Sequence, residues 1–434
     1  MAVSKYLYKT IAWRGLVFVA SFFLNLAIAR VYGAAESGIF FYNISIYSLI
    51  ILVVSLSLEA GLGFYANSEP AKVNRLFSFS ILWFIIISVL LFVIFFSSFF
   101  FINPHKVVLL KALPFISGNI LMTFMTGLFY ARKHFVIPNV IMLVAYGILF
   151  LLLPGFLIKT ISLPQYLNLY LWTYLFIAII MALLFYAREL KGNNWEWPGL
   201  NILKPLIKYA AIAWVGNIIF FFLYRVDYWF IEHYSGKIEL GNYIQVSRLA
   251  QVFFLVPAIV ASVIFPVTAS SPGREMMKML ALISRLFFGL YIVTCAFIAL
   301  TGRWLFPWLF GESYHAMYMP FMFLIPGILA LSMLYPITAY FAGINKVVLN
   351  LKASAIALCF MIAGDIIFIP AYGIYAAAIV SSASYIIFHL ILFFYLKKSF
   401  NIQVKSFFFI QKNDFSILKS YFTGSIKSHN GIQQ

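Results

Sequence analysis

The sequence predicts an all-α integral membrane protein with about twelve transmembrane helices in two halves of six. Of its 434 residues 64% are hydrophobic and only 10% are charged, whereas a soluble domain is about half apolar. Apolar stretches long enough to cross a bilayer, about 20 residues each, follow one another along almost the whole chain. One long polar break divides them into two equal sets.

The predicted spans follow the apolar stretches in order. The first set is expected at residues 8–32, 38–62, 78–102, 107–130, 136–158 and 164–187, and the second at 205–233, 241–270, 279–301, 316–342, 347–369 and 373–396. The first stretch leads straight into another and has no small-residue cleavage site after it. We therefore expect a retained helix and not a signal peptide.

The polar break between the two sets, Arg188–Lys204, holds the Gly, Asn and Pro residues of a linker. Short patterns recur across it in the same order: Ile11-Ala12-Trp13 returns as Ile212-Ala213-Trp214, and Leu183–Arg188 returns as Leu392–Lys397. Such repeats are typical of transporters built from a duplicated unit. We predict an amino-terminal six-helix lobe at 1–190, a cytoplasmic linker at 191–204, a carboxyl-terminal six-helix lobe at 205–396 and a basic cytoplasmic tail at 397–434.

The distribution of positive charge predicts the orientation. With the amino terminus in the cytoplasm, most Lys and Arg residues fall in the cytoplasmic turns and in the tail, and few fall in the outer turns. The positive-inside rule then places both termini in the cytoplasm. In the tail, Phe415, Leu418, Phe422 and Ile426 recur at helical spacing beside lysines, which fits either a helix on an anionic membrane surface or a disordered basic segment.

The composition also excludes several classes. The net charge of +18 is spread between apolar runs and forms no stripe, so no nucleic-acid partner is expected. Cys295 and Cys359 each lie inside an apolar run, which predicts free, buried thiols and neither a disulfide nor a metal site. The predicted outer turns are short and lack paired acids or a histidine cluster, so we expect no catalytic residues.

Charged residues inside the predicted spans are the candidate functional groups, because an ionised side chain in the bilayer costs at least about 3 kcal/mol. Arg225, Asp227 and Arg248 interrupt the seventh and eighth spans. In an antiparallel hairpin turning near Ser235, Asp227 and Arg248 reach similar depth and could pair. Asp227 would then orient Arg248 and leave Arg225 facing a watery cavity; the alternative is that all three only snorkel or join helices.

Two further charged residues leave alternatives open. Arg14, in the first span, could face the same cavity or snorkel to the cytoplasmic surface. Asp365 lies near the outer end of the eleventh span, where a solvated interface position competes with a neutral acid that binds a coupling proton. Glu59 lies near a predicted span end, where a solvated position is favoured.

Prolines interrupt several of the apolar runs. Pro257 and Pro326 are the candidate hinges, because a proline inside a helix removes a backbone hydrogen bond and permits bending. Static kinks are the alternative.

The motifs of this chain, taken in order, resemble those of the polysaccharide-transporter family of lipid-linked oligosaccharide flippases (Wzx-like). That family belongs to the MOP superfamily, which also holds the MATE multidrug exporters and the lipid II flippase. The resemblance spans residues 10–396, and its motifs are Tyr32-Gly33 with Glu36 and Gly38, Arg225-Val226-Asp227, Glu239–Tyr243, Ser247-Arg248-Leu249, Ile264–Pro266, Phe310–Tyr314, Ala342-Gly343 and Ile369–Gly373. Asp365 stands where the family usually has Asn, and Ala376 replaces a usual glycine.

The resemblance implies two six-helix lobes around a central cavity that opens alternately to either side, as in MATE proteins. It implies a bacterial inner-membrane flippase for a polyprenyl-diphosphate-linked oligosaccharide such as an O-antigen unit, with membrane lipid and polysaccharide polymerase machinery as partners. Arg14, Arg225 and Arg248 would bind the diphosphate, because arginine offers forked donors that fit phosphate. Asp365 or Asp227 would bind a coupling ion, Na⁺ or H⁺, and no other cofactor is expected. The alternatives are a multidrug or cation exporter, a lipid II-type flippase and, with less support, a polytopic membrane enzyme.

Overall fold

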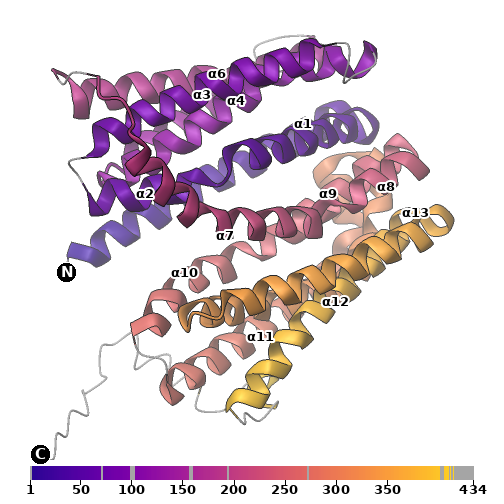
Figure 1. Cartoon of the computed structure of the whole chain (residues 1–434). Helices are drawn as coiled ribbons and strands as arrows, with labels where there is room; N and C mark the ends of the chain where they lie inside the picture. Colours follow the sequence, from indigo (N-terminus) through magenta and orange to yellow (C-terminus); the bar gives the residue numbers. More distant parts are fainter. Residues whose placement is uncertain are drawn as a thin grey trace, which may run out of the picture. The chain divides into compact units, whose positions relative to one another are not determined.

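The computed structural model describes residues 2–69, 72–97, 103–155, 160–192, 195–270, 273–400, 405–409, 411 and 414. Long α-helices account for most of this part of the chain (Figure 1). Nine helical stretches within it are long and apolar enough to cross a membrane. The chain is therefore a multi-pass membrane protein, as its sequence predicts.

The helices follow the predicted spans closely. Their bounds are α1 Ala2–Ser55, α2 Leu58–Ser68, α3 Val73–Phe96, α4 Asn103–Ala131, α5 Val136–Leu151, α6 Leu163–Phe185, α7 Leu200–Arg225, α8 Asp227–Tyr234, α9 Lys237–Phe253, α10 Leu255–Ser270, α11 Arg274–Phe310, α12 Tyr318–Gly343, α13 Val347–Phe400 and α14 Lys405–Phe408, with a π-helical turn η2 at Tyr186–Leu190 and a 3₁₀ turn η3 at Glu312–Met317.

Two of these helices contain a sharp bend at a glycine, and each is long enough for two spans. Gly33 in α1 has φ 71° and Gly373 in α13 has φ 55°, a region that glycine enters without steric cost. The bends fall where the sequence predicts turns between consecutive spans. Together with the shorter helix α5 (16 residues), the nine stretches accommodate the predicted twelve crossings.

The chain forms two compact units, which we describe separately. Unit 1 comprises residues 1–244 and 306–315, and unit 2 comprises 245–305 and 316–434. Helix α9 passes from unit 1 to unit 2 after Ile244, and α11 passes from unit 2 to unit 1 after Leu305. The boundary between these compact units lies after α8, so it differs from the linker at 191–204. The two lobes of the sequence analysis remain a prediction.

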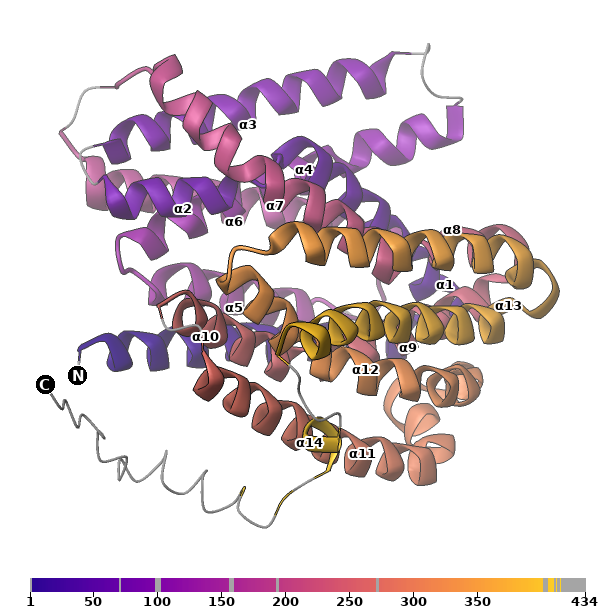
Figure 2. The ribbon, with the colours of Figure 1, turned by 60° about the horizontal axis from the view of Figure 1, so that its bottom comes forward.

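Unit 1 is built around tight helix pairs. Helix α4 packs along α6 and α3, α5 packs on α1, and α2 packs on α4 and α7 (Figures 1 and 2). Gly118 of α4 lies against the backbone of α6, since a Cβ there would lie 2.5 Å from the Leu175 nitrogen. Helices approach this closely in membranes only where one of them presents a small residue.

Unit 2 is organised by α12, which packs on α10 and on α13. Hydrogen bonds join α12 to both halves of α13, at Asn350 before the Gly373 bend and at Ser382 after it. At Gly327 the backbone N–H donates a 2.7 Å hydrogen bond to the Ser382 hydroxyl, and a Cβ would lie 2.8 Å from Ser382 Cα. The predicted hinge Pro257 lies in the first turn of α10, just after α9 and α10 separate at Phe254, whereas Pro326 lies inside α12. The positions of these prolines do not show whether α10 or α12 bends during function, so both hinges remain predictions.

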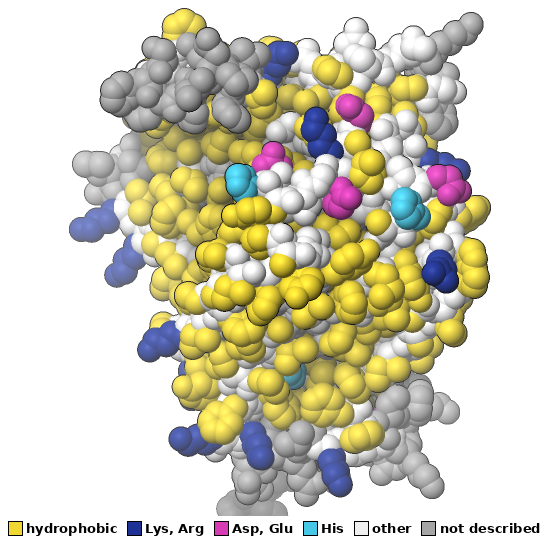
Figure 3. All heavy atoms as spheres, turned by 90° about the vertical axis from the view of Figure 1, so that its right-hand side faces the viewer, with side chains coloured by type: hydrophobic (Ala, Val, Ile, Leu, Met, Phe, Trp, Pro, Cys, Tyr) yellow, Lys and Arg dark blue, Asp and Glu magenta, His cyan; other side chains and the backbone are white. Residues whose placement is uncertain are grey.

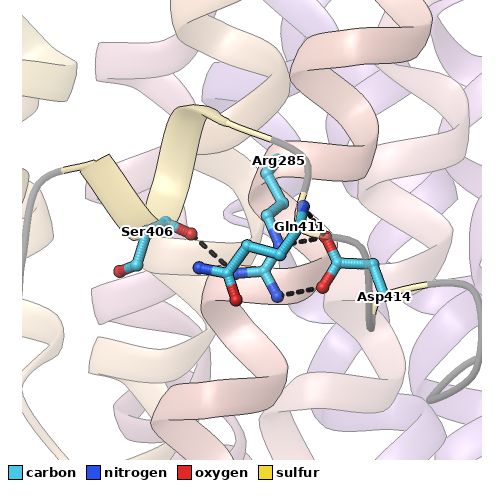
Figure 4. A network of polar contacts seen from close by, with 4 residues as sticks. All are labelled: Arg285, Ser406, Gln411 and Asp414. Atoms are coloured by element: carbon cyan, nitrogen blue, oxygen red, sulfur yellow. Dashed lines mark hydrogen bonds and ion pairs between the residues drawn. The ribbon is translucent and has the colours of Figure 1, made fainter.

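The first tail residues pack against unit 2. In α14 the Phe407 side chain is fully buried and touches Phe393 of α13, while Phe408 lies edge-on to Phe288 of α11. Arg285 of α11 holds Asp414 and the Ser406 carbonyl (Figure 4). The predicted amphipathic segment Phe415–Ile426 lies outside the described residues.

The surface of the described helices is strongly apolar. Figure 3 shows one face, where hydrophobic side chains form a broad field. Charged and histidine side chains lie within its upper part, and Lys and Arg side chains also lie along its left and lower edges. An exposed apolar field of this extent is expected of a protein whose surface meets lipid. The prediction of two buried thiols is correct for Cys295 and wrong for Cys359, which is exposed, because an apolar span turns one side of its helix toward lipid.

Candidate functional site

A strained break in the backbone of unit 1 positions the candidate site. Helix α1 ends at Ser55 and α2 begins at Leu58, and Leu56 and Ser57 between them have φ of 50° and 52°. Residues other than glycine rarely adopt this conformation, at a cost of about 1–2 kcal/mol each. Irregular backbone is tolerated at membrane depth where protein buries it or where it lines a cavity. Ser57 is fully buried, and its hydroxyl accepts a 3.1 Å hydrogen bond from Asn217 of α7.

The break places Glu59 in the first turn of α2, beside a cavity of about 400 Å³. The cavity lies within unit 1, and its lining also includes Arg14 of α1, Thr123, Tyr130 and Asn139. The Arg14 guanidinium carbon lies 4.7 Å from the centre of the Tyr130 ring, a cation–π distance. Asn139 Nδ2 donates a 2.8 Å hydrogen bond to the Tyr130 hydroxyl. Tyr130 thus contacts Arg14 at the cavity wall, and Asn139 positions the Tyr130 hydroxyl.

A second cavity of about 740 Å³ shares Glu59, Ala60, Gly127 and Tyr130 with the first. Its other lining residues come from the end of α2, from the turn between α4 and α5 and from the start of α7, and they are Gly63, Phe64, Asn67, Ala131, Lys133, Phe135 and Tyr209. The two cavities therefore adjoin one another at these four residues, and we treat their combined lining as the candidate site. It holds cations, one carboxylate and several aromatic rings, and pockets of this size and mixture bind small molecules or head groups.

The predicted residues Arg225 and Asp227 lie at the junction of α7 and α8, where they face different partners. The Arg225 guanidinium carbon lies 4.8 Å from the centre of the Phe221 ring. Asp227 is 1% exposed and accepts a hydrogen bond from the Tyr243 hydroxyl of α9. The tyrosine is a partner that the sequence analysis missed, although Tyr243 closes one of the motifs it singled out.

The other two predicted residues belong to unit 2. Arg248 is half-buried in α9, and Asp365 is fully buried inside α13. The surrounding protein covers the Asp365 side chain completely, and its placement at the membrane interface remains a prediction. Asp227 and Arg248 lie in different units, so their pairing remains a prediction, as does ion binding at either acid.

Three of the sequence motifs meet at one place in unit 1. The Ala34 N–H, just after the bend in α1, donates a 3.0 Å hydrogen bond to the Ser313 hydroxyl of η3, and Ser37 and Tyr314 share a 2.5 Å hydrogen bond. Asn242 of α9 donates to the Ser313 carbonyl at 3.0 Å. We call this assembly of α1, α9 and η3 the outer clasp, because all three segments belong to turns that the sequence places outside.

Glycines allow the outer clasp to close. A Cβ on Gly241 would lie 1.9 Å from the Ala34 carbonyl oxygen, and one on Gly38 would lie 2.7 Å from Gly241 Cα. Arg30 donates to the carbonyls of Trp308 and Leu309 in the last turn of α11, where backbone acceptors lack helical partners. The three sequence motifs that meet here therefore share a structural role, which is to hold α1, α9 and η3 together.

No protein-family model matches this sequence, and no curated protein sequence matches it either. Solved structures do match. An inward closed structure of the lipid II flippase MurJ aligns with 96% of this chain and 94% of its own at a TM-score of 0.70 and 15% identity. An inward-facing MATE multidrug transporter of the MOP superfamily aligns with 88% of this chain and 94% of its own, at a TM-score of 0.67 and 14% identity.

The chain has the fold of MurJ and the MATE transporters. A MOP superfamily transporter from Pyrococcus furiosus, described as having a binding pocket of reverse polarity, aligns with 91% of this chain and 95% of its own at a TM-score of 0.60 and 13% identity. At such low identity the shared property is the architecture, which confirms the predicted MATE-like fold class.

Only part of the site could be read from the sequence. Arg14 was a candidate, and the structure places it in the wall of a cavity of unit 1; its binding of substrate remains a prediction. Glu59 was expected to be solvated at a span end, but a break after Ser55 brings it to the cavity. The signal that could have indicated this is the Ser55-Leu56-Ser57 interruption of an apolar run, which ends two residues before Glu59.

Proposed function

We propose that the chain is a flippase that moves a polyprenyl-diphosphate-linked oligosaccharide across the bacterial inner membrane by alternating access. The observation that carries the proposal is Arg14, a cation that lies over the Tyr130 ring and lines a cavity of unit 1 in a membrane protein. A diphosphate is a doubly anionic group that arginine binds through two parallel hydrogen bonds. The prenyl tail remains in lipid while the polar head occupies the cavity.

The remaining parts of the proposal rest on the sequence. Both termini lie in the cytoplasm, and Arg225 and Arg248 bind the same diphosphate on its way across. Asp365 or Asp227 binds the coupling ion, Na⁺ or H⁺, and polysaccharide polymerase machinery receives the product. Cargo moves if it favours one of two arrangements of the protein over the other.

Reconstitution into proteoliposomes tests the proposal. The wild-type protein is expected to carry a fluorescent polyprenyl-diphosphate oligosaccharide between leaflets, and Arg14→Met is expected to slow this roughly 10- to 100-fold, because it removes a charged hydrogen bond worth about 1.5–3 kcal/mol. Arg303→Met, which removes an exposed arginine of α11, is the matched control. Joint loss of Arg225 and Arg248 should abolish transport without loss of folded protein. Transport by Arg14→Met at the wild-type rate would refute the role of the cavity.

A cation exporter is the second candidate, because Glu59 supplies a carboxylate to both cavities. An exporter of this class would move a lipophilic cation across the same proteoliposomes and would not move the glycolipid. Measuring both cargos with one preparation separates the two functions.

A further inference from the structure

The larger cavity of unit 1 contains an aromatic platform that the role of Arg14 leaves unexplained. The rings of Phe64 in α2 and Tyr209 in α7 stack with centroids 5.0 Å apart and planes 14° apart. Tyr65 lies edge-on to Tyr209, at 6.5 Å and 71°. Phe64 and Tyr209 are 49% and 48% exposed, so about half of each side chain's surface remains open while both line the cavity.

Polar groups surround this platform. Asn67 lies three residues after Phe64 on α2, Glu59 lies five residues before it, and Lys133 comes from the turn between α4 and α5. An amide both donates and accepts hydrogen bonds, a carboxylate accepts them, and an ammonium attracts anions. A lipid chain offers these groups no hydrogen bond, and covering polar groups with hydrocarbon is costly. Hydrocarbon is therefore a poor occupant of this cavity.

A sugar can contact both the aromatic rings and the polar side chains of this cavity. One face of a pyranose ring presents C–H groups that pack on an aromatic ring, and its hydroxyls project from the edge toward donors and acceptors. Aromatic side chains supply a large, rigid contact area of this kind. The cavity volume of about 740 Å³ lies within the range of about 300–1,000 Å³ of small-molecule sites.

We infer that Phe64 and Tyr209 form a saccharide subsite, in which the first sugars of a lipid-linked glycan stack on the rings while Asn67 and Glu59 bind their hydroxyls. The inference rests on the proposed function and adds to it where the sugar binds. Arg14 and Lys133 then contact the diphosphate that joins the sugar to the lipid. The subsite gives the protein a preference for glycan-bearing lipid over bare prenyl diphosphate.

Binding measurements on the purified protein test the subsite. The two probes are a short-chain prenyl diphosphate and the same molecule carrying an oligosaccharide. The wild-type protein should bind the sugar-bearing probe at least about tenfold more tightly, since one or two aromatic contacts are worth about 1.4 kcal/mol in total. Phe64→Leu with Tyr209→Leu keeps apolar bulk, removes the rings, and should abolish this preference while leaving the Kd of the bare probe unchanged.

Phe176→Leu is the control, because Phe176 is 59% exposed on α6 and lines neither cavity. If the double variant is unstable, Asn67→Ala tests the same preference from the polar side. Equal affinity of the wild type for both probes, or a preference that survives loss of the rings or of Asn67, overturns the subsite. The proposed function is tested by a different experiment: it is overturned if the wild-type protein moves no glycolipid in proteoliposomes, whatever the binding measurements show.

Discussion

Arg285 of α11 and Asp414 of the tail form a buried, bidentate ion pair, although they are 129 residues apart in the sequence (Figure 4). Arg285 Nε lies 2.6 Å from Asp414 Oδ2, a second guanidinium nitrogen binds Oδ1, and the third lies 2.7 Å from the Ser406 carbonyl oxygen. The side chains are 7% and 0% exposed. Bidentate pairs of this kind combine charge attraction with fixed geometry. Arg285 therefore binds the beginning of the tail to helix α11 of unit 2.

Breaking this pair from one side should release the tail. Asp414→Asn leaves the Arg285 charge buried with a weaker partner, and removal of one member of a buried pair costs about 3–5 kcal/mol. We expect much faster proteolysis after Phe409, followed by mass spectrometry. Glu275→Gln is the matched control, because its pair with Lys278 on the same helix is 86% and 73% exposed and such pairs contribute little. Unchanged proteolysis of Asp414→Asn would show that the aromatic contacts of α14 suffice.

The same pair predicts how tail docking depends on pH. Burial by itself raises the pKa of Asp414, but the hydrogen bonds from Arg285 and from the Gln411 N–H outweigh it, and the pKa is lowered below 3.8. A lowered pKa means that docking is stabilised at every pH above the ordinary value and lost only as pH falls through the lowered one. The proteolysis rate should therefore be flat from neutral pH down to about 4. A rise near pH 6 would point to a different group.

The outer clasp should be sensitive to a single methyl group. Gly241→Ala places a Cβ 1.9 Å from the Ala34 carbonyl oxygen, and neither backbone can yield without moving a helix. Overpacking of this kind costs at least about 1–3 kcal/mol, which should lower the melting temperature in detergent. Gly147→Ala in α5 is the control, because nothing lies within 4 Å of its Cβ position, and alanine there favours the helix. Equal melting temperatures for the two variants would contradict this packing.

Buried Asp227 should depend on the Tyr243 hydroxyl. Tyr243→Phe removes one donor from a carboxylate that is 1% exposed, which costs about 1–3 kcal/mol when a buried acceptor loses its partner. Thermal unfolding would measure the loss, with Tyr372→Phe at an exposed position as the control.

The charge swap Asp227→Arg with Arg248→Asp tests the predicted pairing, because recovery of function lost in each single variant requires that the two side chains meet.

The sequence predicts features that depend on neighbouring residues, and it does not predict contacts between residues far apart in the chain. The bends at Gly33 and Gly373 were predictable because apolar runs end beside a residue that tolerates positive φ. The break at Leu56 and Ser57 was not, since neither residue type favours that conformation and burial of Ser57 sustains it. The pair of Arg285 with Asp414 was not predictable, because the acid lies in a tail whose local composition indicates no packing.

Lys133 offers a test in which stability and binding should respond differently. It lies at φ 64° after α4, where the His134 N–H bonds the Phe129 carbonyl at 2.8 Å and the Lys133 N–H bonds Tyr130 at 3.0 Å. This helix ending favours glycine, so Lys133→Gly relieves backbone strain of about 1 kcal/mol and makes the unfolded chain more flexible by a similar amount. The melting temperature should change little. Affinity for prenyl diphosphate should fall several-fold and lose part of its salt dependence, because a cation leaves the cavity.

Asn345→Gly is the control for Lys133→Gly, because α12 ends in the same way. Asn345 has φ 60°, the Lys346 N–H bonds the Phe341 carbonyl at 2.8 Å, and the Asn345 N–H bonds Ala342 at 3.0 Å. This variant makes the same backbone change at a turn of unit 2 that lines neither cavity of unit 1, so its affinity for prenyl diphosphate should equal that of the wild type. If both glycine variants bind the probe as the wild type does, Lys133 has no part in the site. If both lose affinity equally, backbone flexibility and not the lost cation is the cause.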